Sequence, residues 1–225
     1  FTMVEWYRRD ADYQQIATDV EQLVAHVAST CSGHLTVQDR QGMSIDLSPP
    51  WPQWTLADAM AEFAGIHLPA PDDATGLRSA AVAAGMSSIG PEDDWETAFY
   101  KILIERVEPS LARTGRGVHL LDWPAPMAAL SRLKKSNPSV AERGGSYAGG
   151  LELSNGFSEL TDPREQRRRF HIERLRRQNR DGSTLPVDES FLRGLAMGMP
   201  DAAGVALGLD RLMLLVSPYN DLRYL

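Results

Sequence analysis

Residues 151–162 read Leu-Glu-Leu-Ser-Asn-Gly-Phe-Ser-Glu-Leu-Thr-Asp, and this stretch decides which fold the sequence predicts. Every second residue shares a face in it, as in a β-strand. One face carries an amide, an aromatic ring and a carboxylate, from Asn155, Phe157 and Glu159. These groups suit a small organic cation, because the ring can cover an alkyl chain while the carboxylate meets an ammonium group. The stretch therefore predicts a strand that binds a ligand.

Two features of this stretch leave alternatives open. Asn155-Gly156 lies between strand-like runs, a pattern that is also typical of a tight hairpin turn. Glu152 falls on the opposite face from the binding residues unless a β-bulge changes the alternation. Gly149-Gly150 or Gly156 could supply such a bulge.

Composition excludes several classes of protein. The chain has 225 residues, 43% hydrophobic and 24% charged, which is ordinary for a globular domain. Its formal net charge of -7 indicates that the surface as a whole does not attract nucleic acid. The single cysteine, Cys31, excludes an internal disulfide, and the five scattered histidines indicate no transition-metal site. No apolar run approaches the length of a membrane span. The single cysteine fits a reducing cytosol, so we expect a cytoplasmic protein.

The N-terminal half predicts a strand, a helix and a peripheral region. Residues 1–8 are rich in strand-forming side chains, and Glu5 and Tyr7 share one face, although Glu5 alone is more typical of a solvent-facing residue. Residues 12–28 have the apolar stripe of a core helix. We expect residues 32–94 to form an insertion outside the central sheet, with a hairpin at 34–47 and short helices after it.

The second half predicts further elements around the binding strand. We expect a strand at 118–121, a helical turn at 128–133 and a mobile polar loop at 134–145. A helix that begins after Asp162 carries eight arginines, which are more typical of a solvated face than of a docking surface for an acidic partner. Residues 204–211 join a strand to a helix through small residues, which let a ligand approach the backbone or let the strand and the helix pack closely.

Three stretches resemble class II lysyl-tRNA synthetases in the same order along the chain. Phe-Thr-Met-Val-Glu-Trp-Tyr at 1–7 resembles the second half of motif 2, and residues 151–162 resemble the amino-acid-binding strand. Gly-Val-Ala-Leu-Gly-Leu-Asp-Arg at 204–211 resembles motif 3. The chain is most similar to a short paralogue family, the elongation factor P lysine ligases. The resemblance covers about 1–30 and 118–216.

The resemblance implies a fold and an activity. The fold is α+β, a class II aminoacyl-tRNA synthetase-like antiparallel sheet flanked by helices, with residues 1–225 as one catalytic domain whose N-terminal part is missing. The activity is that of an ATP-dependent ligase, which activates lysine or (R)-β-lysine as an adenylate. The acyl group then passes to a lysine of elongation factor P, with tRNA an unlikely acceptor, and the family expectation is a homodimer.

The resemblance also implies an ATP site. Phe1 and Arg211 sandwich the adenine ring, and Arg211 is the catalytic residue because it can neutralise the phosphate that is attacked. Glu152 helps to hold Mg²⁺ with ATP, and Gly208 lies beside the nucleotide. In the family, a second glutamate that binds metal and ATP stands where this chain has Gly145. Glu142, three residues earlier, is a candidate substitute.

The implied amino-acid site comes from three stretches. Asn155 contacts the amino acid, Phe157 covers its alkyl chain, and its terminal ammonium is surrounded by Glu159, Glu5 and Tyr7. Ala206 stands where lysyl-tRNA synthetases carry glycine, and its methyl group reshapes the pocket. Two other functions stay open, a lysyl-tRNA synthetase catalytic domain and, because of Gly145, a non-enzymatic paralogue that binds an amino acid without forming an adenylate.

Overall fold

A computed structural model describes residues 1–39, 41–218 and 223 of the chain. Seven strands of this part of the chain form one sheet. They are β1 (Met3–Arg9), β4 (Gln53–Thr55), β5 (Val118–Pro124), β6 (Leu133–Lys134), β7 (Asn137–Ala148), β8 (Leu151–Ser158) and β9 (Ala202–Gly208). The order across the sheet is β1-β9-β8-β7-β5-β4, with β6 paired to β7, and only β4 and β5 pair in parallel among these strands.

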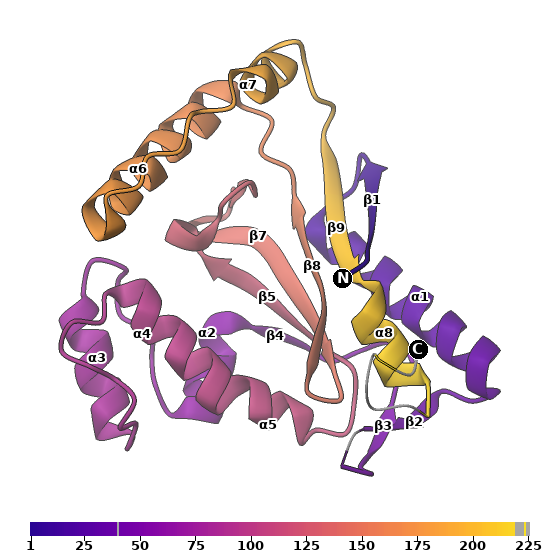
Figure 1. Cartoon of the computed structure of the whole chain (residues 1–225). Helices are drawn as coiled ribbons and strands as arrows, with labels where there is room; N and C mark the ends of the chain where they lie inside the picture. The colour runs from indigo at the N-terminus through magenta and orange to yellow at the C-terminus, as the bar shows by residue number, and fades with distance from the viewer. Residues whose placement is uncertain (40, 219–222, 224–225) are drawn as a thin grey trace.

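Helices flank this sheet, as Figure 1 shows. They are α1 (Tyr13–Ser32), α2 (Leu56–Ala59), α3 (Ala74–Ala83), α4 (Trp95–Ile102), α5 (Glu108–Ala112), α6 (Pro163–Asp181), α7 (Glu189–Ala196) and α8 (Leu209–Val216). A π-helical segment, Met60–Ala64, extends α2, and another, Leu103–Val107, joins α4 to α5. The mostly antiparallel sheet with flanking helices confirms the predicted α+β fold. No helix in the described part of the chain is long and apolar enough to cross a membrane.

Two hydrophobic cores cover different parts of the sheet. On one face, Ile16 and Val20 of α1 pack against Leu153 of β8 and Leu207 of β9. The helix begins with a capping box at Asp12, which satisfies backbone N–H groups of its first turn. On the opposite face, α4 and α5 cover only the end of the sheet around β5. The surface of β1, β9 and β8 that faces away from α1 therefore carries side chains that reach solvent or a ligand.

The core of α4 and α5 is rich in aromatic rings. Phe99 and Ile102 of α4 pack with Leu120 and Trp123 of β5, and the rings of Phe99 and Trp123 lie 6.0 Å apart. Burial of such rings is a large stabilising contribution. This core fixes α5 beside the β7–β8 turn, where the side chain of Ala112 would lie 3.6 Å from a Cβ at Gly150.

Most elements predicted from the sequence are confirmed. The N-terminal strand, the core helix, the strand at 118–121 and the strand–helix joint at 204–211 all form. The predicted hairpin forms from β2 (Thr36–Gln38) and β3 (Ser44–Asp46), although Arg40 in its turn lies outside the described residues.

Three predictions about the middle of the chain are wrong. Residues 134–145 are not a mobile loop, because most of them belong to β7, which pairs with β5 on one side and β8 on the other. Residues 128–133 form a turn that leads into β6 instead of a helical turn. Residues 32–94 do not lie wholly outside the sheet, because β4 extends it. In each case backbone pairing with distant strands overrides a polar or proline-rich local sequence.

Candidate active site

The three segments that carry the predicted site lie side by side in the sheet. Strand β9 pairs with β1 on one side and β8 on the other (Figure 1). Glu5, Ala206 and Asn155 are in register across β1, β9 and β8, and Gly145 of β7 continues the row. Their side-chain positions point away from α1, since the alternate residue Leu207 packs against that helix. The predicted adjacency of the three segments is therefore confirmed.

A second row runs beside the first. Tyr7, Gly204, Phe157 and Arg143 are in register across β1, β9, β8 and β7. A Cβ at Gly204 would lie 2.7 Å from Oε1 of Glu159 and 2.8 Å from Cε1 of Tyr7. Only glycine fits at this point, because the Tyr7 ring and the Glu159 carboxylate approach the backbone there. The structure thus brings both side chains to one place.

The Glu159 carboxylate is buried without a counter-charge. Its residue is 9% exposed, and it has no ion-pair partner in the described part of the chain. Burial raises its pKa from the ordinary 4.5 to about 7. The pKa of Tyr7 is also raised, first by burial and then by the negative charges of Glu159 and Glu5. This end of the surface lacks positive charge, and a ligand ammonium group would supply it.

A β-bulge at Leu153 brings Glu152 to the face of the binding residues. Ser154 pairs with Ser146, but Glu152 pairs with Tyr147, so Leu153 has no partner opposite and turns into the α1 core. The sequence indicated that a bulge would be needed. It offered Gly149-Gly150 or Gly156 as possible places for the bulge, whereas Gly149-Gly150 adopt positive φ in the turn between β7 and β8.

Glu152 and Arg211 form a polar corner beside the amino-acid surface. Nη1 of Arg211 donates a hydrogen bond to the backbone oxygen of Glu152 (2.6 Å) and lies 3.6 Å from its carboxylate. Burial nevertheless raises the pKa of Glu152, against the opposing effects of Arg211 and Arg143. Burial raises the pKa of Glu108 in α5, and the nearby negative charge of Glu152 raises it further.

These residues fit a magnesium–ATP complex. Mg²⁺ is usually bound through one or two carboxylates together with substrate phosphates. Glu152 supplies one such carboxylate, and no group of three or more metal-ligating side chains exists among the described residues that would hold a metal by itself. Arg211, an exposed cation at the start of α8, can meet phosphate oxygens or stack on a base.

The beginning of the chain is tied to this corner. The backbone N–H of Thr2 donates to the Asp210 carboxylate (2.6 Å), and the N–H of Leu209 donates to the Thr2 oxygen (3.0 Å). Met3 is paired with Gly208. Phe1 is fully exposed at the same end of the sheet as Arg211. The adenine sandwich between these two side chains stays a prediction.

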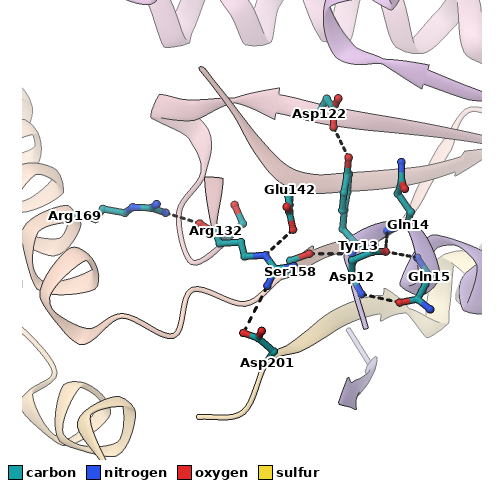
Figure 2. A network of polar contacts seen from close by, with 11 residues as sticks. Asp12, Tyr13, Gln14, Gln15, Asp122, Arg132, Glu142, Ser158, Arg169 and Asp201 are labelled. Carbon is teal, nitrogen blue, oxygen red and sulfur yellow. Dashed lines mark hydrogen bonds and ion pairs between the residues drawn. The ribbon is translucent and has the colours of Figure 1, made fainter. Parts of the chain in front are cut away.

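The hypothesis that Glu142 replaces the missing glutamate at Gly145 is wrong. Figure 2 shows Glu142 in a polar network with Arg132 and Asp201, and its carboxylate accepts a hydrogen bond from Nε of Arg132 (2.7 Å). A residue three positions from Gly145 in a strand faces the other side of the sheet. The space above Gly145 is instead occupied by Tyr147, whose Cε2 would lie 2.9 Å from a Cβ there.

We expect Gly145→Ala to destabilise the protein by about 1–3 kcal/mol, as overpacking of a core does. The added methyl would push the ring of Tyr147, which is only 4% exposed and packs in the α4–α5 core. Urea unfolding would measure the loss. Gly194→Ala is the matched control, since a Cβ at Gly194 in α7 meets nothing within 4 Å. Equal stabilities for the two variants would contradict the prediction.

Sequence analysis missed Arg143. The residue lies beside Phe157 in the second row, but the polar composition of the segment around it predicts a loop. Arg143, Gly145 and Tyr147 alternate along the sequence as residues on one face of a strand do, and this alternation could have predicted β7. The two glycines obscure it, because glycine is rare in strands.

Most arginines of α6 are engaged in ion pairs. The pairs are Arg168 and Arg169 with Glu165, Arg167 with Glu189, Arg176 with Glu96, Arg177 with Glu173, and Arg180 with Asp181. These exposed pairs favour the solvated-face interpretation over a docking surface for an acidic partner. In Figure 1 this helix extends away from the end of β8, and its Gln166 alone is buried among its described residues.

Comparison with known proteins identifies the family. The model of the class II (D, K and N) tRNA synthetases matches residues 1–225, and the chain belongs to this family. A lysine–tRNA ligase of Moorella thermoacetica is 36% identical over 226 residues, which cover 99% of this chain and 45% of that protein. Lysine–tRNA ligases of Dehalococcoides mccartyi and a Synechococcus species are 35% and 34% identical, again with 99% of this chain but only 44% and 45% of theirs. The chain thus spans less than half the length of these relatives.

Proposed function

We propose that this chain is the catalytic domain of a ligase that activates lysine, or a close analogue, as an aminoacyl-adenylate. The observation that carries the proposal is the buried Glu159 carboxylate without a counter-charge, which lies in one surface with the Glu152–Arg211 corner. A diamino acid complements this surface. Its terminal ammonium meets Glu159, with Tyr7 and Glu5 around it, while its carboxylate lies toward the phosphate-binding corner.

The residues have distinct roles in this proposal. A carboxylate oxygen of lysine attacks the α-phosphorus of ATP, the bond to the β-phosphate oxygen breaks, and pyrophosphate leaves. Such a step needs positioning and charge neutralisation more than covalent help. Phe157 and Asn155 hold the amino acid, and Arg211 neutralises phosphate charge. Glu152 would hold Mg²⁺, which offsets further negative charge on the phosphates when bound.

Two molecules are candidate acceptors of the activated lysyl group, and a different observation supports each. The relatives are named lysine–tRNA ligases, which supports tRNA as the acceptor. A lysine amine of elongation factor P is the second candidate, and (R)-β-lysine its favoured substrate. That candidate is supported by Ala206, whose methyl occupies the centre of the row between Glu5 and Asn155. The homodimer stays a prediction from the resemblance, and the cytoplasmic location stays a prediction from the composition.

Pyrophosphate exchange by the full-length protein tests the proposal. We expect exchange that depends on lysine or (R)-β-lysine. Absence of exchange with both amino acids would refute it, and binding of ATP and lysine without exchange would identify an amino-acid-binding paralogue. Transfer of labelled lysine to bulk tRNA or to elongation factor P then separates the two acceptors.

Lysine affinity should fall about 10-fold between pH 8 and pH 6. With a pKa of about 7, Glu159 is ionised in roughly nine molecules of ten at pH 8 and one in ten at pH 6. Only the ionised carboxylate attracts the ligand ammonium, so binding weakens as the pH falls. Calorimetric titration at several pH values measures the effect. An affinity that does not change over this range would contradict the assignment of Glu159.

A further inference from the structure

We propose that Arg143 is a positioning residue, which holds the Asn155 side-chain amide with its NH₂ group toward the ligand. Asn155 thereby becomes a hydrogen-bond donor for the carboxylate of the amino acid, and the site distinguishes amino acids from amines. The inference rests on the proposed function, because it concerns how that site recognises its substrate.

Arg143 is itself held rigidly by two anchors. Its guanidinium lies 4.4 Å from the centre of the Trp123 ring, a cation–π arrangement in which the planar group stacks on an aromatic face. Nη1 donates a hydrogen bond to the backbone oxygen of Met127 (2.6 Å). A planar group fixed by a ring on one face and a carbonyl at one edge keeps its remaining N–H bonds in fixed directions.

One of those bonds sets the direction of the Asn155 amide. Nε of Arg143 donates to Oδ1 of Asn155 at 3.3 Å. Arginine has donors and no acceptor, so the contact is favourable only when the amide oxygen, and not its NH₂ group, faces Arg143. Nδ2 then points away from Arg143 and has no hydrogen-bond partner among the described residues.

The free NH₂ group lies where a ligand carboxylate is needed. Asn155 is in the same row as Glu5 and Ala206, on the surface that faces away from α1. An NH₂ group stabilises a carboxylate oxygen, whereas an amide flipped by 180° would present its own oxygen and repel it. Arg143 thus converts a side chain that can either donate or accept into a donor alone.

Two ligands, L-lysine and cadaverine, distinguish a role of Arg143 in carboxylate recognition from a general contribution to the stability of the fold. In calorimetry with the full-length protein, we expect Arg143→Gln to weaken L-lysine binding about 10-fold, the scale of one hydrogen bond to a charged group. Binding of cadaverine, which is lysine without its carboxylate, should change less than 2-fold. Arg143→Lys should resemble Arg143→Gln, because an ammonium on a flexible stem restores the charge but not the fixed N–H direction.

A matched arginine variant serves as the control for Arg143→Gln. Arg116→Gln is the matched variant, since Nη2 of Arg116 also donates to a backbone oxygen, that of Ser48 (3.1 Å), outside the candidate site. It should leave both affinities unchanged. The proposal is overturned if Arg143→Gln weakens lysine and cadaverine equally, if it weakens neither, or if Arg143→Lys keeps full lysine affinity.

The behaviour of the unmodified protein distinguishes failure of the proposal from failure of the proposed function. Equal affinity for lysine and cadaverine would show that the site does not recognise a carboxylate, and would overturn the role of Arg143 while leaving the ammonium site intact. Binding of neither ligand would refute the proposed function and this inference with it. The side-chain NH₂ signal of Asn155, assigned by its loss in Asn155→Asp, should also shift in Arg143→Gln.

Discussion

Glu159→Gln is expected to abolish lysine-dependent pyrophosphate exchange. Removing one partner of a buried ion pair costs about 3–5 kcal/mol, which corresponds to a loss of roughly 10²-fold to several thousand-fold in lysine affinity. The amide keeps the shape of the side chain but cannot balance the ligand ammonium. Exchange rates and calorimetry with lysine measure the loss. An unchanged exchange rate would refute the assignment of Glu159 to the ammonium group.

The same substitution should stabilise the protein without ligand. The pKa of Glu159 is raised in the folded state from 4.5 to about 7, so ionisation is disfavoured there relative to the unfolded chain. The resulting destabilisation is absent below pH 4.5, grows between pH 4.5 and 7 and is complete above pH 7. Glu159→Gln should therefore raise Tm at pH 8 and have little effect at pH 4.5.

Glu142→Gln is the matched control for Glu159→Gln. Glu142 is a largely buried carboxylate of the same sheet, but it is paired with Arg132 outside the candidate site. Its substitution should lower Tm at pH 8 and leave lysine-dependent exchange intact. If both substitutions lower Tm at pH 8, Glu159 is not the uncompensated charge that the structure indicates.

Arg211→Gln should lower kcat/KM for pyrophosphate exchange by about 10²–10³-fold, the effect of removing one preorganised group that stabilises developing charge. The loss has two physical sources. The phosphates lose a cation, and Glu152 loses the neighbouring positive charge that most opposes the rise of its pKa. ATP binding should weaken, whereas lysine affinity should stay within 2-fold.

The control for Arg211 is Arg180→Gln on α6. Arg180 is also an exposed arginine next to a carboxylate, since its Nη2 lies 3.2 Å from Oδ2 of Asp181, and none of the predicted site residues belongs to α6. It should leave ATP binding and exchange unchanged. Equal ATP affinity in Arg211→Gln and in the unmodified protein would contradict the phosphate-binding role.

The sequence predicted the elements whose signals are local. Alternation with a period of two places Asn155, Phe157 and Glu159 on one face, and capping residues mark where α1 and α6 begin. Arg143 and Tyr147 escaped prediction because β7 contains two adjacent glycines and few apolar residues. Its strand conformation depends on hydrogen bonds to β5 and β8, which a local pattern does not contain.

What the sequence determined by itself is the kind of side chains that the binding strands present, because alternation along a strand is set by its own backbone. Only the tertiary structure decided which strands lie together: β9 between β1 and β8, Glu152 turned to the binding face by the bulge at Leu153, and Tyr147 in the space above Gly145. The physical reason is that register and burial result from contacts between different strands, such as those of Ala206 with Glu5 on one side and Asn155 on the other, which no local pattern contains. Those contacts also leave Glu159 without a counter-charge and give Asn155 its direction.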